Sequence, residues 1–423
     1  MPAASADAGA GEAEGPSPGG PGGGPASPAD LVPEPLRSDL VGLRRRLHAH
    51  PEISGQERET RETLRGFLEE RGVSELREVA GTGLVARIPG RDPEVPAVAV
   101  RGDIDALPIR EETGLPFASE RPGVMHACGH DIHASWAVGA ALLLAESPAD
   151  GDALLVLQPA EETAEGARAV LEAGALEEAA AIFGAHVDTA FEVGKVVAQP
   201  GPLAASADRF DVTVRGRGGH AARPHQTRDP LAAAADLVGR LYALVPRRLG
   251  TDRAAVLSVG ALHAGEAFNV IPGEARLRGT IRATDPETRK RVVAELERVT
   301  RATAEAHGVE AGVEVTPAVP ALLNGEREAG WAREAAGRVL GPGAVVPLPG
   351  RNMAGEDFAF YLEEVPGAFL RIGAREPGEE PIGAHSPRFR PSEDALFVGA
   401  AVLAEAARTA SRGLAGGGAA GGG

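Results

Sequence analysis

The sequence predicts an α/β protein in which a ferredoxin-like α+β unit interrupts a larger domain with a central mixed sheet covered by helices. Short apolar segments alternate with amphipathic helices over residues 31–204 and again after residue 318. That alternation is typical of a sheet covered on both faces. Between them, residues 205–317 follow the order β-α-β-β-α-β of the ferredoxin-like arrangement. We therefore expect one discontinuous domain, 31–204 with 318–410, and one inserted domain, 205–317.

Composition limits the class of protein. The chain has 423 residues, 43% of them hydrophobic, which is ordinary for a globular protein of two or three domains. A net charge of −17 argues against nucleic acid or an anionic membrane as partner. No segment approaches the ~18 apolar residues of a membrane-spanning helix. A single cysteine cannot form an intramolecular disulfide, so we expect a cytoplasmic protein.

Both ends of the chain have the composition of tails. The first 30 residues are mostly Ala, Gly, Pro and Ser and include no Lys or Arg. A signal peptide needs a basic start and an apolar stretch of roughly 7–15 residues, and neither is present. We expect residues 1–30 and the Gly/Ala-rich residues 411–423 to be disordered.

The elements of the larger domain follow from the spacing of its apolar residues. Leu and Phe at three- and four-residue spacing predict helices near the start, and short apolar runs predict strands. In chain order, we expect helices at 36–47 and 56–71, a strand at 95–100, a helix at 133–146, a strand at 153–157, a helix at 164–175, and strands at 179–183 and 368–372.

The insertion has its own alternation. Pro230 suits the first turn of a helix, and the apolar residues of the strand at 210–214 alternate with polar ones. The expected elements are a strand at 210–214, a helix at 229–245, strands at 254–262 and 274–283, a helix at 286–307 and a strand at 309–315.

Polar residues that could bind a metal ion follow three of the predicted strands. Asp103 and Asp105 follow the first, Glu161 and Glu162 the second, and His186 the third. Open α/β sheets place their functional sites at the carboxyl ends of the strands. We therefore expect these side chains to gather at one edge of the sheet.

The two adjacent glutamates need a particular backbone to act together. Glu161 and Glu162 would point to opposite faces if their strand continued. Pro159 cannot donate a hydrogen bond to the sheet, so the strand is expected to end there. Both carboxylates can then turn toward the same site.

The segment 125–133 contains the only cysteine and three of the eleven histidines. A Cys128 thiolate and a His130 imidazole can both bind a borderline divalent metal. The alternative is a buried structural cysteine beside surface histidines. One glutamate and two histidines from other strand ends and loops complete a metal set of Cys128, His130, Glu162, His186 and His385.

The charges of this set predict further roles. Two divalent ions carry four positive charges, whereas one thiolate and one carboxylate supply two negative ones, which favours a bridging hydroxide at neutral pH. Glu161 could then accept the proton of the water and pass it to a leaving amine. Asp105 could orient an imidazole, and Asp103 could equally cap a turn. Zinc, manganese, cobalt and nickel all suit such ligands.

Three more polar segments stand out. His220 lies in a Gly-rich stretch without the Lys-Ser/Thr of a phosphate-binding loop, so it is either a substrate contact or an incidental residue of a hairpin turn. Asn269 could bind a carboxylate or carbonyl of a substrate. Glu356 and Asp357 form another unusual polar pair, but they could equally cap a helix at 357–364.

Together these segments resemble the aminoacylase and carboxypeptidase-like co-catalytic metallohydrolases, in the branch of bacterial N-acyl-amino-acid amidohydrolases, hippurate hydrolases and plant auxin-conjugate hydrolases. The resemblance runs from about Leu43 to Ala406. The matching segments are residues 47–52, 101–108, 125–133, 158–162, 186, 219–220, 269–272, 355–358 and 385–387.

The resemblance implies roles for single residues. It implies that Cys128, His130, Glu162, His186 and His385 bind two metal ions and that Glu161 is the general base. It also implies that the insertion is a dimerisation or lid domain whose His220 stabilises the tetrahedral oxyanion, in some members across the dimer interface. We therefore expect a homodimer through residues 205–317, with the strand at 254–262 as an exposed edge.

The function implied is that of a metal-dependent amidohydrolase, a hydrolase related to metallopeptidases, that cleaves acetyl-, benzoyl- or indoleacetyl-type N-acyl amino acids into an acid and a free amino acid. A dipeptidase or carboxypeptidase of the same fold would use the same chemistry. A non-catalytic binding protein would be expected to lack the general base or several ligands, and all are present in this chain.

Overall fold

The computed structural model describes residues 27–417. A short 3-10 helix, η1 (Pro28–Leu31), and the end of the last helix, α9 (Asp394–Gly417), occupy positions that the sequence assigned to tails. This corrects the boundaries predicted at 30 and 411. Helix α9 continues because its last turns are anchored: the buried Ser411 hydroxyl accepts a 2.7 Å hydrogen bond from the Gly151 backbone. The rest of both predicted tails lies outside the described residues.

The larger domain contains the predicted mixed sheet, which has seven strands. Its order is β1-β2-β4-β3-β5-β15-β6, in which β4, β3, β5 and β15 are parallel and the outer strands antiparallel. The strands are β1 (Leu76–Val79), β2 (Gly83–Ile88), β3 (Ala97–Asp103), β4 (Ala153–Gln158), β5 (Ala179–Glu192), β6 (Val196–Val197) and β15 (Gly367–Arg375).

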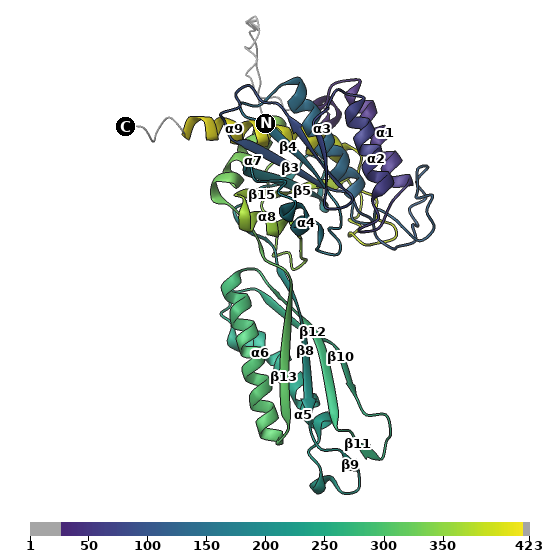
Figure 1. The fold of residues 1–423 in the computed structure, drawn as a ribbon, viewed down its shortest axis with the longest axis vertical. Coiled ribbons are helices and arrows are strands. Elements are labelled where there is room, and N and C mark those ends of the chain that lie inside the picture. The colour runs from purple at the N-terminus through teal and green to yellow at the C-terminus, as the bar shows by residue number, and fades with distance from the viewer. Residues whose placement is uncertain (1–26, 418–423) are drawn as a thin grey trace, which may run out of the picture.

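Helices cover both faces of this sheet (Figure 1). Alternate strand residues belong to two separate hydrophobic clusters, so Val98 and Leu155 pack on one face and Ala99 and Leu154 on the other. The first cluster packs against α1 (Leu36–Ala49), α2 (Arg58–Glu69), α3 (His130–Glu146), α7 (Glu326–Leu340) and α9, and the second against α4 (Gly166–Glu172) and α8 (Phe358–Glu364).

The insertion is a four-stranded antiparallel sheet in the order β10-β12-β8-β13. Phe210, Leu241, Leu277 and Leu296 lie in the core between this sheet and two helices. The elements are β8 (Ser206–Arg215), α5 (Pro230–Arg248), β10 (Ala255–Ala264), β12 (Glu274–Ala283), α6 (Pro286–His307) and β13 (Glu310–Val319), which is the predicted ferredoxin-like order. Strand β10 is an edge strand, as predicted for residues 254–262.

The insertion extends from one end of the larger domain (Figure 1). Two short strands, β7 (Gly201–Ala204) and β14 (Leu322–Asn324), pair where the chain enters and leaves it. At its opposite end, β9 (Gly219–His220) pairs with β11 (Val270–Ile271), next to a short 3-10 helix, η2 (Pro224–Gln226). None of the described helices is long and apolar enough to cross a membrane.

One strand boundary differs from the prediction in a way that affects the site. The sequence placed His186 after a strand at 179–183, but β5 continues to Glu192. Its residues remain paired to β15, with His186 opposite Arg371. His186 therefore projects from the middle of a strand, which fixes its backbone more firmly than a loop would.

Candidate metal centre

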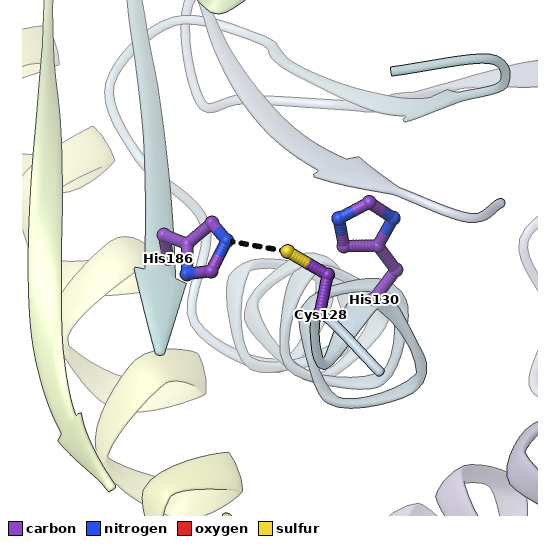
Figure 2. A group of neighbouring side chains, drawn as sticks. All are labelled: Cys128, His130 and His186. Carbon is purple, nitrogen blue, oxygen red and sulfur yellow. Dashed lines mark hydrogen bonds between the residues drawn. The ribbon is translucent and has the colours of Figure 1, made fainter. Parts of the chain in front are cut away.

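The five candidate metal ligands meet at the carboxyl ends of β3 and β4 and beside β5, as the sequence predicted for this edge. Among the described residues, five groups of side chains have ligand atoms within 4.8 Å of one another, and three overlapping groups contain all five candidate ligands. Figure 2 shows the first group, in which Cys128 lies between His130 and His186. These three groups are Cys128 with His130 and His186, Cys128 with Glu162 and His385, and His130 with Glu161 and Glu162. The other two are His130 with Asp103 and His133, and Glu161 with Glu356 and Asp357.

Backbone conformation brings these side chains together. Gly129, between Cys128 and His130, has a φ of 90°, and a Cβ there would lie 2.6 Å from Val187 Cγ2. Only glycine fits that close approach in the left-handed region. Strand β4 ends at Gln158, and Ala160 turns the chain with a φ of 52°. The predicted stop at Pro159 is confirmed, and Glu161 and Glu162 enter the same site.

Two histidines are oriented by their second ring nitrogen. His130 Nδ1 lies 2.9 Å from the Asp105 carbonyl oxygen and 3.0 Å from Asp105 Oδ1, which leaves Nε2 facing the site. His186 Nδ1 lies 2.7 Å from the Val187 carbonyl oxygen, so it carries the proton and Nε2 keeps its lone pair. Such partners are typical of histidines that bind metals.

The donor atoms fit divalent cations. Cys128 Sγ lies 3.2 Å from His186 Nε2, and Glu162 Oε1 lies 3.3 Å from His385 Nε2 and 3.9 Å from His130 Nε2. The buried His130 Nε2 has no hydrogen-bond partner among the described residues. Since an unpartnered buried polar atom costs about 1–3 kcal/mol, a cation that accepts its lone pair would remove that cost.

The electrostatics of the site also favour a cation. Burial raises the pKa of the Cys128 thiol and lowers that of His186. Burial works against a charged His130, yet the carboxylates of Asp103 and Asp105 outweigh it and raise the pKa of that imidazole. The electrostatic potential around His130 is therefore negative. Positive charge placed among these residues would be stabilised and would in turn stabilise a Cys128 thiolate.

Replacing Cys128 by serine is expected to weaken metal binding, because a hydroxyl is a far poorer ligand than a thiolate for borderline metals. Metal titration followed by elemental analysis measures the affinity and stoichiometry. Circular dichroism should show an unchanged fold, since the two side chains have nearly the same shape. If the variant bound two ions with wild-type affinity, Cys128 would not be a ligand.

Asp105 contacts both His130 and the backbone of Glu162, two candidate ligands from different parts of the chain. Its Oδ1 accepts from His130, and its Oδ2 accepts from the Ser54 hydroxyl at 2.7 Å and the Glu162 backbone N–H at 3.0 Å. These contacts fit the orienting role predicted from the sequence. Asp103, for which the sequence left a turn cap open, instead lies fully buried between Arg101 at 2.6 Å and His133 Nδ1 at 2.7 Å.

Sequence reasoning missed a buried charge network centred on Arg101. Its guanidinium lies 3.2 Å from Glu356 Oε1, 3.1 Å from Asp357 Oδ1 and 2.8 Å from Gln158 Oε1. The side chain of Asp357 does not cap α8 and instead accepts from Gln158 and the Ala167 backbone. Glu356 Oε1 does accept a 3.2 Å hydrogen bond from the Phe358 backbone N–H at the start of α8, as the sequence allowed. The signal that could have revealed the network is an arginine inside an apolar strand.

His220 and Asn269 lie next to each other but not at the metal centre of their own chain. His220 pairs with Val270, and the Asn269 carbonyl accepts a 3.1 Å hydrogen bond from Ala221. Both residues are exposed, at the end of the insertion farthest from the larger domain (Figure 1).

The metal candidates open into a cleft of about 740 Å³. Most of its wall comes from the larger domain, including the segment 352–356 before α8. Arg282 of β12 adds a contribution from the insertion. The cleft is large enough for a small organic substrate.

The chain is similar along most of its length to hydrolases and peptidases of known sequence or structure. The chain is 41% identical over 381 residues to an N-acetylcysteine deacetylase of Bacillus subtilis, covering 89% of this chain and 98% of the relative. It is 37% identical over 376 residues to IAA-amino acid hydrolase ILR1-like 5 of Arabidopsis thaliana, covering 87% and 86%. The crystal structure of the Bacillus subtilis YXEP protein, a dinuclear metal binding peptidase, superposes with a TM-score of 0.80 at 38% identity, covering 90% and 99%.

The resemblance derived from the motifs is thereby confirmed. The model of the peptidase family M20/M25/M40 matches residues 99–409, which include every candidate ligand and the whole insertion. With relatives above 30% identity matched over nearly their whole length, the chain belongs to the peptidase family M20/M25/M40.

Proposed function

We propose that this chain is a metal-dependent amidohydrolase that cleaves the amide bond of N-acyl amino acids to a carboxylic acid and a free amino acid. The observation that carries this proposal is the meeting of a thiol, three imidazoles and two carboxylates in one cluster, which opens into the cleft. Relatives whose names specify an N-acetylcysteine deacetylase and an IAA-amino acid hydrolase support an acylated amino acid as substrate.

Two divalent cations fit this donor set. Cys128, His130, Glu162, His186 and His385 would hold them. When bound, such ions polarise a carbonyl group and lower the pKa of water to about 7 in favourable sites. Zinc, manganese, cobalt and nickel all remain candidates, because mixed sulfur, nitrogen and oxygen ligands accept each of them.

Glu161 is the proposed general base. Its carboxylate lies 4.0 Å from His130 Nε2 and beside the ligand Glu162. Burial, together with the nearby carboxylates of Glu356 and Asp357, raises its pKa, so it holds a proton more readily than an exposed glutamate. Glu161 would take one proton from the attacking water and deliver it to the amide nitrogen as the carbon–nitrogen bond breaks. Asp105 would keep His130 and the turn at Glu162 in place.

A homodimer through residues 205–317 would complete the site. The six large hydrophobic side chains that are exposed in the described part of the chain all lie in the insertion, on α5, on β10 and at the β11 end. They are Leu231, Tyr242, Val256, Leu262, Phe268 and Val270. The Tyr242 hydroxyl lies 3.2 Å from the Val259 carbonyl oxygen, so part of the apolar surface of α5 adjoins the β10 edge.

Pairing at this edge would bury apolar side chains that a monomer leaves in water. Because His220 and Asn269 lie at the far end of the insertion, they would then serve the partner's metal centre. His220 would donate to the developing oxyanion, and Asn269 would bind a carbonyl or carboxylate of the substrate.

A dipeptidase or carboxypeptidase is the second candidate, because the same residues would hydrolyse an unblocked peptide. A substrate panel distinguishes the two. Protein treated with chelator and reloaded with each of the four metals is offered acetyl-, benzoyl- and indoleacetyl-amino acids and unblocked dipeptides. We expect metal-dependent release of free amino acid from the acylated substrates. Hydrolysis of the dipeptides alone would contradict the proposed function.

A further inference from the structure

Arg371 occupies a wall of the metal cleft. It lies on β15 in register with His186 on the parallel strand β5. Side chains at the same register of neighbouring strands project from the same face of a sheet. Arg371 therefore projects to the face from which the candidate ligand His186 projects.

The guanidinium of Arg371 has no ion pair within the described residues, since no carboxylate oxygen lies within 4.0 Å of its nitrogens. Two other arginines of the larger domain are paired, whereas Arg282, the second arginine of the cleft wall, has no ion pair among the described residues either. Arg375 on the same strand meets Glu192 at 3.5 Å, and the buried Arg101 meets three carboxylates. Arg371 is only partly buried, so its donors remain available to a molecule that enters the cleft.

A free guanidinium at this place indicates an anionic ligand. The guanidinium presents its N–H groups in a planar fork that matches the two oxygens of a carboxylate. The other charged side chains of the wall near the metal candidates are acidic, namely Glu161, Glu162, Asp188 and Glu356, so they offer no donor to a carboxylate. Every N-acyl amino acid carries an α-carboxylate close to its amide bond, and acidic amino acids carry a second one.

We propose that Arg371 binds a carboxylate of the substrate and thereby sets the preference of the cleft for N-acyl amino acids over neutral amides. This inference rests on the proposed amidohydrolase function. The alternative is that Arg371 only offsets the negative charge of Glu356, in which case it would affect charged and neutral substrates equally.

The test compares Arg371→Met with wild type, both loaded with metal, on N-acetylalanine, N-acetylalanine amide and N-acetylaspartate. Losing a charged hydrogen bond is expected to raise KM for N-acetylalanine by about 10- to 100-fold. Turnover at saturation and kcat/KM for the amide should change by less than about threefold. Arg371→Lys should recover part of the loss, because it restores the charge without the planar fork.

Two controls support the interpretation. Arg46→Met changes an exposed arginine of α1 outside the cleft and should have wild-type kinetics. Elemental analysis should find wild-type metal content in Arg371→Met, which separates substrate binding from damage at His186.

The substrates also identify the carboxylate. A KM increase for both acids but not for the amide assigns the α-carboxylate, whereas an increase for N-acetylaspartate alone would limit Arg371 to a side-chain carboxylate and overturn its role in the preference for N-acyl amino acids. Equal losses on acid and amide, or no loss at all, overturn the inference.

Equilibrium binding measurements test the role of Arg371 independently of hydrolysis. Calorimetry with N-acetylalanine and its amide, in Glu161→Gln protein with and without Arg371→Met, measures the same preference without turnover. A protein that bound the acid through Arg371 but hydrolysed no N-acyl amino acid would contradict the proposed function and keep the role of Arg371. Hydrolysis of N-acyl amino acids that did not depend on Arg371 would support the proposed function and contradict the role of Arg371.

Discussion

Glu161→Gln is expected to lower turnover of N-acyl amino acids by about 100-fold or more while both metal ions still bind. Glutamine keeps the size of glutamate and can still form hydrogen bonds, but it cannot accept the proton of the attacking water. Glu161 is in a position to act on a substrate, because its carboxylate lies close to His130 and Glu162 and lines the cleft. Steady-state turnover at saturating N-acetylalanine and elemental analysis of the same preparation give the two readouts.

Neighbouring glutamates make matched controls. Glu165→Gln alters an exposed carboxylate four residues along the chain, just before α4, and should keep turnover within about twofold of wild type. Glu162→Gln should instead lose metal, because Glu162 is a proposed ligand. Near-normal turnover in Glu161→Gln would contradict the base assignment, and loss of metal from it would make Glu161 a ligand.

The sequence predicted the local features of this site because they depend on neighbouring residues. Pro159 ends a strand wherever that strand lies, so the inward turn of Glu161 and Glu162 could be inferred without knowing the fold. The helices and strands of the insertion were likewise recognisable from their spacing, including the edge position of β10. His186 was recognised as a site residue, although the strand that carries it is longer than its apolar run suggested.

Long-range partners could not be predicted. Arg101 is buried because carboxylates 255 and 256 residues later in the chain lie against it. No local pattern reports such a contact, so the sequence indicates only a helix cap for Glu356 and Asp357, and of the two only Glu356 also accepts from the start of α8. Arg371 was overlooked for the same reason: its place in the cleft follows from the pairing of β15 with β5, which only the folded chain shows.

His220→Ala is expected to lower turnover by about 10²- to 10³-fold without loss of metal, as for removal of one oxyanion donor. The position of His220 determines how this loss would arise. His220 is exposed at the end of the insertion, beside the almost fully exposed Phe268 (99%) and Asn269, and away from its own metal residues. The effect therefore requires a homodimer, whose mass light scattering measures. His225→Ala, an exposed histidine in the same end of the insertion, should leave turnover unchanged.

A mixed dimer decides whether His220 acts on the partner's site. One subunit carries Glu161→Gln and the other His220→Ala, each with its own affinity tag, and each homodimer is nearly inactive. If His220 serves the partner, one site of the heterodimer joins an intact Glu161 to an intact His220, and about half of wild-type activity returns. If it serves its own chain, both sites keep one defect and nothing returns. A fully active monomer, or a purified heterodimer as inactive as its parents, would contradict the shared site.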